Sequence, residues 1–316
     1  MQVPVVDLSD EAVRNADPKA LCALDAACRD HGFFLIINHG LEGVIDNMWN
    51  HAATFFATPR EQRLAIERTQ TQPLGYYDRE LTKQRRDLKE VFDFMRPAAD
   101  SKQRNQWPDA MPDFRSAMDH YYETMSGLAA QVLDLVVRAL GVAGSALLPG
   151  DANTSNVRLN HYPIADPLSD SERRSVNPLG DMALHHHTDP GLITLLVQDA
   201  TGGLQTHSMS LGWIDVPPLA GSIIVNLGDA VQAHSNDQYR AAVHRVLPMT
   251  DRTRMSTPYF FNPAADAIIA PHPDLIADEA VFRPFAWREL IRSRIDDNFQ
   301  DLGVEDTQVD KYRIHA

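Results

Sequence analysis

The stretch Ala183–Gln198, ALHHHTDPGLITLLVQ, indicates both the fold and the chemistry of this chain. Its apolar run 192–197 is typical of a buried β-strand. His187 and Asp189 precede that run and are separated by one residue. If they lie at the end of a strand, period-two alternation places both side chains on one face. An imidazole and a carboxylate on one face supply two of the three ligands of a 2-His-1-carboxylate iron site.

A His-x-Asp match alone is weak evidence, because a chain with 13 His residues contains such pairs by chance. A second match, His272-Pro273-Asp274, follows a further proline at position 271. Proline cannot donate to a β-ladder, so we expect this second pair to lie in a loop and to bind no metal. The first pair therefore needs support from the rest of the sequence.

Composition and charge restrict the class of partner. The 316 residues are 44% hydrophobic and 23% charged, which is sufficient for a large core. The formal net charge is −14 and no dense Lys/Arg cluster is present, which argues against nucleic acid and anionic membranes as partners. The N-terminus lacks a signal-peptide pattern, and Cys22 and Cys28 would lie on different faces of one helix. We expect a cytoplasmic protein without a disulfide, monomeric or weakly self-associating.

The two halves of the chain differ in pattern. The first half contains strand-like runs and amphipathic helices, the longest over 113–140 with apolar residues at 3, 4 spacing. From residue 155 onward, short apolar or alternating runs recur between turn residues, at 156–162, 192–197, 203–207, 213–216, 222–226, 242–247 and 254–261. This pattern predicts a mixed α and β protein with an antiparallel sandwich or barrel core, such as a jelly roll, and a helical N-terminal region packed on it.

We expect one catalytic unit, residues 1–316, in four regions. These are an N-terminal region (1–98), a long support helix (99–154), a jelly-roll core (155–263) and a C-terminal segment (264–316).

The third metal ligand is expected to be a histidine on another strand. The candidates after Asp189 are His207, His234, His244, His272 and His315. His244 is favoured because it lies in the strand-like run 241–246. Arg254 and Ser256 follow, again two residues apart and therefore on one face. A turn over 248–252 would place Arg254 opposite His244 on a neighbouring antiparallel strand, with Cβ atoms about 5 Å apart. A guanidinium suited to a carboxylate would then lie beside the metal.

Motifs along nearly the whole chain resemble the isopenicillin N synthase-like family of 2-oxoglutarate/Fe(II) oxygenases. They are VPVVDLS (3–9), ACRDHGFFLIINHG (27–40), NHYP (160–163), HTDPGLITLLVQD (187–199), GGLQ (202–205), VNLGD (225–229), SND (235–237), YRAAVHRV (239–246), RMS (254–256) and FFNP (260–263). Found together in this order, they are highly specific.

The resemblance implies a double-stranded β-helix with Fe(II) bound by His187, Asp189 and His244, and with 2-oxoglutarate and O2 as co-substrates. It also implies that Arg254 and Ser256 hold the distal carboxylate of 2-oxoglutarate, and that Asn160 and Tyr162 face the co-substrate. The implied reaction is oxidation of a small molecule, most simply hydroxylation, with release of succinate and CO2. Two alternatives stay open: a 2-oxoglutarate-independent iron oxidase or cyclase on the same scaffold, and a non-catalytic jelly-roll binding protein.

The substrate is not specified by these motifs, and hydroxylation, desaturation, cyclisation and demethylation are not separated by them. We expect pocket residues from 76–78, 89–94 and the part after Phe261, because loops carry specificity. The cationic side chains at 79, 85, 86 and 89 are expected on the solvated surface, with contact to an anionic substrate as the alternative. His185 and His186 are expected to be packing or pocket residues and not ligands, and His207 either a surface or a substrate contact.

Overall fold

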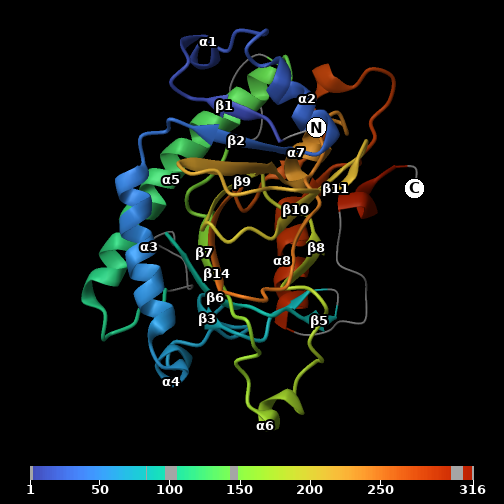
Figure 1. The fold of residues 1–316 in the computed structure, drawn as a ribbon. Coiled ribbons are helices and arrows are strands. Elements are labelled where there is room, and N and C mark those ends of the chain that lie inside the picture. The colour runs from blue at the N-terminus through green and yellow to red at the C-terminus, as the bar shows by residue number, and fades with distance from the viewer. Residues whose placement is uncertain (1–2, 83, 97–104, 143–148, 300–308, 315–316) are drawn as a thin grey trace.

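Two facing β-sheets form the centre of the molecule in the computed structural model, which describes residues 3–82, 84–96, 105–142, 149–299 and 309–314 (Figure 1). The larger sheet has the order β1 (Val5–Asp7), β2 (Phe33–Ile37), β12 (Ser222–Leu227), β9 (Ile193–Gln198), β14 (Arg254–Phe261), β7 (Asn156–Tyr162), β6 (Glu90–Met95) and β3 (Gly75–Tyr77). The smaller has the order β11 (Gly212–Asp215), β10 (Leu204–Ser208), β13 (His244–Val246) and β8 (Leu184–His187). All pairs are antiparallel except β1 with β2.

The inner faces of the two sheets share one apolar cluster. Leu196 and Ile224 come from the larger sheet, and Leu204 and Val246 come from the smaller one. Burial of this surface between the sheets supplies the main attraction that holds them together. The arrangement confirms the predicted jelly-roll core, and strands from the N-terminal region extend the larger sheet at both edges.

Helices cover the outer face of the larger sheet. The long helix α5 (Pro112–Ala139) and helix α3 (Glu42–Ala57) lie side by side there (Figure 1). The apolar stripe of α5, including Tyr121, Met125 and Val132, is buried in the same cluster as Val157 and Leu195 on the outer face of the sheet. The predicted amphipathic helix over 113–140 is therefore confirmed to within a residue.

The remaining elements are shorter. They are α1 (Glu11–Arg14), α2 (Cys22–Asp30), α4 (Arg60–Leu64), β4 (Leu81–Thr82), β5 (Arg85–Arg86), α6 (Asp170–Arg173), α7 (Asp229–His234), β15 (Ile268–Ile269), η1 (Pro273–Leu275), β16 (Phe285–Ala286), α8 (Trp287–Phe299) and η2 (Val309–Tyr312). Cys22 is exposed, Cys28 is buried, and both are free thiols, as predicted. Within the described ranges, no helix combines the length and apolar character needed to cross a membrane.

The predicted hairpin that joins His244 to Arg254 is wrong. Strand β13 pairs with β10 and β8 in the smaller sheet, whereas β14 pairs with β7 and β9 in the larger one. The connection after Val246 therefore crosses between the sheets, as consecutive strands of a jelly roll do. Because the two inner faces oppose each other, His244 and Arg254 still line one pocket.

The prediction of a solvated surface location is also wrong for two of the cationic side chains. Arg86 is 2% exposed and forms an ion pair with Asp166. Lys89 is 4% exposed, and its Nζ lies 2.7 Å from Glu80 Oε2 and 3.1 Å from Asp87 Oδ2. Each cation is buried because the fold supplies carboxylates that offset the cost of desolvation.

Candidate metal centre

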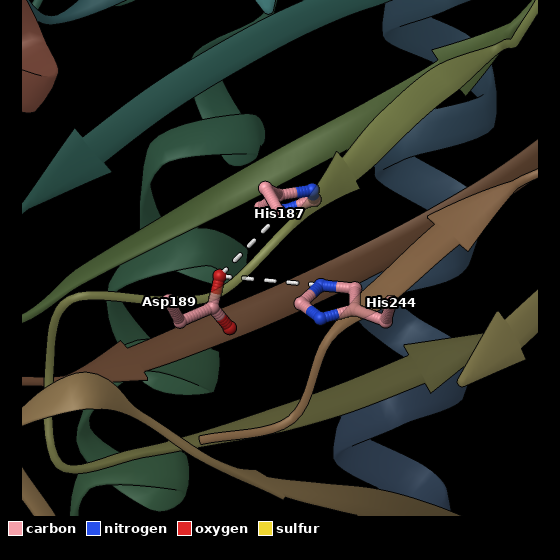
Figure 2. A group of neighbouring side chains, drawn as sticks. All are labelled: His187, Asp189 and His244. Atoms are coloured by element: carbon pink, nitrogen blue, oxygen red, sulfur yellow. Dashed lines mark ion pairs between the residues drawn. The ribbon is translucent and has the colours of Figure 1, made fainter. Parts of the chain in front are cut away.

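Three side chains from two segments of the chain meet between the sheets (Figure 2). His187 is the last residue of β8 and pairs across the ladder with His244, the first residue of β13. Asp189 lies two residues beyond the end of β8. The side chains of His187 and Asp189 therefore lie close together, as predicted, but they do not share a strand. Asp189 Oδ1 is 3.7 Å from His187 Nε2 and 4.0 Å from His244 Nε2.

The two imidazoles are oriented by the backbone. His187 Nδ1 is 2.9 Å from the carbonyl oxygen of His185, and His244 Nδ1 is 2.9 Å from that of Ala242. Each Nδ1 therefore carries the proton and donates it, which leaves the Nε2 lone pair directed at Asp189. Burial lowers the pKa of His187 well below its usual value, and the adjacent His244 lowers it further. A neutral imidazole with a free Nε2 is the form that binds a metal.

The carboxylate of Asp189 is oriented by two residues that lie in the motifs 187–199 and 225–229 but had no predicted role. Thr194 Oγ1 donates to Asp189 Oδ2 at 2.6 Å, and Asn226 Nδ2 donates to the same oxygen at 2.8 Å. Burial raises the pKa of Asp189, but His244, His187 and these two hydrogen bonds outweigh it and lower the pKa below its usual value. Oδ2 is thus occupied by hydrogen bonds, and Oδ1 faces the two histidines as a single anionic donor.

The donor set fits Fe(II). Two neutral imidazoles and one carboxylate form the facial group of non-haem iron oxygenases. The three donor atoms all lie within 4.8 Å of one another, and no other group of three or more His, Cys, Asp or Glu side chains in the described part of the chain is arranged this way. His272 caps η1 by accepting from the backbone N–H of Asp274, whose side chain is exposed, so that pair is not a site.

The loop that carries Asp189 is supported by the C-terminal helix. The backbone N–H of Asp229 donates to the carbonyl oxygen of Asp189 at 2.7 Å. Arg294 of α8 reaches Asp229 Oδ2 at 3.3 Å and Thr188 Oγ1 at 3.2 Å. Burial raises the pKa of Asp229 to about 6. This part of the C-terminal segment thus contacts the residues behind the metal centre.

A buried guanidinium lies in the same pocket as the three donors. Arg254 is 0% exposed and donates to Ser256 Oγ at 3.1 Å and to Gln198 Oε1 at 3.0 Å. Its guanidinium carbon lies 4.9 Å from the centre of the Tyr162 ring. Arg254 forms no ion pair with any described carboxylate, and its Nε has no hydrogen-bond partner. An uncompensated buried cation favours an anionic ligand, and a planar fork suits a carboxylate.

The partners predicted for Arg254 lie beside it. In the ladder between β14 and β7, Arg254 is opposite Tyr162 and Ser256 is opposite Asn160. Asn160 Nδ2 is 3.5 Å from Ser256 Oγ. All four side chains line the pocket, so this end of it fits the carboxylate of 2-oxoglutarate.

The other described histidines lie outside the donor group, and the candidate His315 lies outside the described residues. His185 is buried with its Nδ1 2.8 Å from Asp87 Oδ1, and this hydrogen bond raises its pKa. His186 is exposed near Trp213. His207 packs its ring edge against Trp213 on the side of β10 opposite the buried Leu204 and Thr206, so it faces away from the pocket. The buried position of His185 fits the predicted packing role, and the position of His207 fits a surface residue.

The prediction for the substrate pocket is wrong for all three segments, because neither the first two nor the described residues after Phe261 line it. Among the described residues, the pocket is lined by strands β7, β9, β12 and β14 of the larger sheet, strands β8, β10 and β13 of the smaller one, and Asp189. No residue of 76–78 or 89–94 contributes to it. The carboxylates and Lys89 of that region form ion pairs, which hold their side chains away from the cavity.

Comparisons with known proteins agree with this geometry. Residues 3–110 match the N-terminal family described as non-haem dioxygenase in morphine synthesis, and residues 153–263 match the 2OG-Fe(II) oxygenase superfamily. The chain is 31% identical to gibberellin 2-beta-dioxygenase 1 of Arabidopsis thaliana, over 94% of this chain and 90% of that protein. It is 32% identical to 1-aminocyclopropane-1-carboxylate oxidase 1 of Oryza sativa subsp. japonica, over 90% of this chain and 87% of that protein.

A solved structure extends the similarity to three dimensions. A full-length Neurospora crassa protein in complex with alpha-KG and 5-formyluracil superposes with a TM-score of 0.77 and 27% identity, over 93% of this chain and 95% of that one. The chain belongs to the 2OG-Fe(II) oxygenase superfamily, and it is a dioxygenase that uses Fe(II) and 2-oxoglutarate.

Proposed function

We propose that His187, Asp189 and His244 are the iron ligands, that Arg254 and Ser256 bind the distal carboxylate of 2-oxoglutarate, and that the enzyme hydroxylates a small molecule. The observation that carries this proposal is the pairing of two features in one pocket. Three donor atoms converge there, with the imidazoles and the carboxylate already oriented by hydrogen bonds. A buried guanidinium without a carboxylate partner among the described residues lines the same pocket.

Two histidines and one carboxylate would hold Fe(II) and leave it able to bind co-substrates. When bound, Fe(II) and 2-oxoglutarate supply the oxidising chemistry, with succinate and CO2 as products. The chain holds each ligand in one orientation and places the carboxylate of 2-oxoglutarate on Arg254. Asn160 and Tyr162 shape that end of the pocket. Apolar walls from Leu184, Leu196, Leu204 and Val246 exclude water around the reacting atoms.

Anaerobic Fe(II) binding of the alanine variants of His187, Asp189 and His244 tests the ligand assignment. Each variant should lose stoichiometric iron and the formation of succinate from 2-oxoglutarate in air. His272→Ala is the matched control, because it removes the histidine of the other His-x-Asp sequence and should keep both properties. Iron loss in the control with iron retained in His187→Ala would overturn the assignment. Substrate oxidation without succinate would favour the 2-oxoglutarate-independent oxidase instead.

We also infer that the enzyme acts on free metabolites and not on nucleic acid, which the net charge of −14 supports. The cytoplasmic location, the monomeric or weakly oligomeric state and the division into four regions stay predictions.

A further inference from the structure

We propose that Arg158 recognises the substrate and that it selects a small uncharged molecule with a carbonyl oxygen over acids and amines. The proposal rests on the proposed function, because it takes Arg254 to be the binding site of 2-oxoglutarate.

Arg158 lies at the end of the pocket away from Arg254. Alternate residues of β7 face opposite sides: Val157 is buried beneath the helices, whereas Arg158, Asn160 and Tyr162 line the pocket. Tyr162 is level with Arg254, and Arg158 is four residues back along the strand. At about 3.4 Å per residue, these positions are separated by roughly 13 Å. A molecule bound at Arg158 therefore leaves the Arg254 end free for the co-substrate.

The two arginines of the pocket differ in how their charge is compensated. Arg254 has no carboxylate partner among the described residues. Arg158 has two carboxylate partners. Its Nε lies 2.7 Å from Asp93 Oδ1 and its Nη2 lies 3.1 Å from Asp93 Oδ2. Its Nη1 lies 2.8 Å from Glu80 Oε2. Only Arg254 has charge available for an anion, so an ionised substrate gains little at Arg158.

Basic and acidic side chains are linked by ion pairs around Arg158. A charge network contains the cations Arg68, Lys89 and Arg158 and the anions Glu80, Asp87 and Asp93. Burial raises the pKa of Glu80, but Arg158, Lys89 and Arg68 together lower it well below its usual value. Burial lowers the pKa of Lys89, and the adjacent Glu80 and Asp87 raise it above its usual value. Glu80 and Lys89 are therefore charged near neutral pH, and the ion pairs of this network join three basic side chains to three acidic ones.

Arg158 still has hydrogen-bonding capacity. A guanidinium carries five N–H groups, and the contacts to Asp93 and Glu80 use three of them. Its side chain is 16% exposed and forms part of the pocket wall. Pro258 is level with Arg158 in the ladder, and Leu196 is opposite Pro258. The remaining N–H donors belong to a guanidinium whose charge is already compensated by carboxylates, and they lie in an apolar wall. Such donors match a neutral acceptor, for example the oxygen of an amide, lactam or ketone.

Binding of matched triplets of small probes tests the proposal. Each triplet contains an acid, its primary amide and the corresponding amine, for example phenylacetate, phenylacetamide and phenethylamine, with smaller and larger members included. Ligand-observed NMR on the zinc-substituted, 2-oxoglutarate-loaded protein reports binding without turnover. Wild-type protein should bind amides at least tenfold more tightly than the matched acids and amines. A preference for acids or amines, or no preference for amides, would overturn the proposal.

Two variants of Arg158 and one control complete the test. Arg158→Met and the charge-retaining Arg158→Lys should each weaken amide binding at least tenfold, because both lose the planar fork. Arg86→Met removes an ion-paired arginine that is more deeply buried and lies outside the pocket, and it should leave amide binding unchanged. If Arg158→Met does not fold, Arg158→Lys decides the matter. Undiminished amide binding in the folded Arg158 variant contradicts the proposal.

Binding of 2-oxoglutarate separates this proposal from the function on which it rests. The folded Arg158 variants should bind 2-oxoglutarate as wild type does, because Arg158 lies at the other end of the pocket. Failure of wild-type protein to bind 2-oxoglutarate would refute the proposed function. Normal 2-oxoglutarate binding without amide preference would refute only the role of Arg158.

Discussion

Replacement of Arg254 by leucine removes a fully buried guanidinium from the end of the pocket assigned to 2-oxoglutarate. In the variant, the carboxylate of bound 2-oxoglutarate would face Gln198 and Ser256 without a cation. Loss of one partner of a buried charge pair costs on the order of 2–5 kcal/mol. At about 1.4 kcal/mol per factor of ten, the affinity for 2-oxoglutarate should fall roughly 30-fold to several thousand-fold.

Ser256→Ala should have a smaller effect. It removes one neutral hydroxyl, which is worth about 1 kcal/mol, or roughly a fivefold loss of affinity. Fe(II) binding should survive in both variants, because neither side chain belongs to the donor group.

The assay is an anaerobic titration of the Fe(II) protein with 2-oxoglutarate, followed by the absorption band of the iron complex. Arg86→Leu is the matched control, since Arg86 is also buried and charged but lies outside the pocket. Its 2-oxoglutarate affinity should equal that of wild type. Unchanged affinity in Arg254→Leu would refute the reasoning and would leave Arg254 to hold the carboxylate of the substrate itself.

Three further predictions concern the surroundings of the metal and the acid stability. The double change of His185 and His186 to Gln should retain stoichiometric Fe(II), measured by metal analysis, and loss of half the iron would contradict this. Asn226→Ala removes one of the two hydrogen bonds to Asp189 Oδ2 and should weaken Fe(II) binding about 10- to 100-fold in a metal titration, whereas unaltered affinity would argue against this orienting role. Burial raises the pKa of Glu90, but His161, Tyr76 and Arg63 outweigh it and hold the pKa at about 2, below its usual value of 4.5. Its stabilisation, about 3 kcal/mol, is therefore complete above pH 4.5 and is lost as the pH falls towards 2. Urea unfolding of Glu90→Gln should show a shallower loss of stability over that range, and a slope equal to that of wild type would contradict the assignment.

Local pattern was sufficient for most of the fold. The strands at 156–162 and 254–261 and the helix over 113–140 match the predicted ranges closely, because each carries an uninterrupted apolar period. The metal group was also predictable from His187 and Asp189 beside a buried strand, and from His244 in a second strand-like run. His187 and His244 lie at strand ends, and Asp189 lies in the loop directly after one. The apolar pattern that predicts these strands therefore also indicates where the three side chains lie.

Contacts between distant segments were not predictable in the same way. The sequence between His244 and Arg254 fits either a hairpin or a crossover, and only the pairing of β13 with β8 and of β14 with β7 distinguishes the two. Thr194 and Asn226 gave one weak signal, a polar residue inside an apolar strand. Both are buried and both donate to Asp189, which explains why polar side chains occupy these strand positions.

Arg158 and Arg254 illustrate why residue type alone does not assign a ligand. Both line one pocket from neighbouring strands, and both would be read from sequence as sites for an anion. The chain places Glu80 and Asp93 against Arg158 from more than 60 residues away, and it places only the neutral Ser256 and Gln198 against Arg254. Because a charge that is already neutralised adds little affinity for a second anion, we expect the carboxylate of 2-oxoglutarate to bind at Arg254. Selectivity between the two ends of the pocket thus depends on the partners behind each guanidinium, and the fold brings the carboxylates behind Arg158 from outside the motifs.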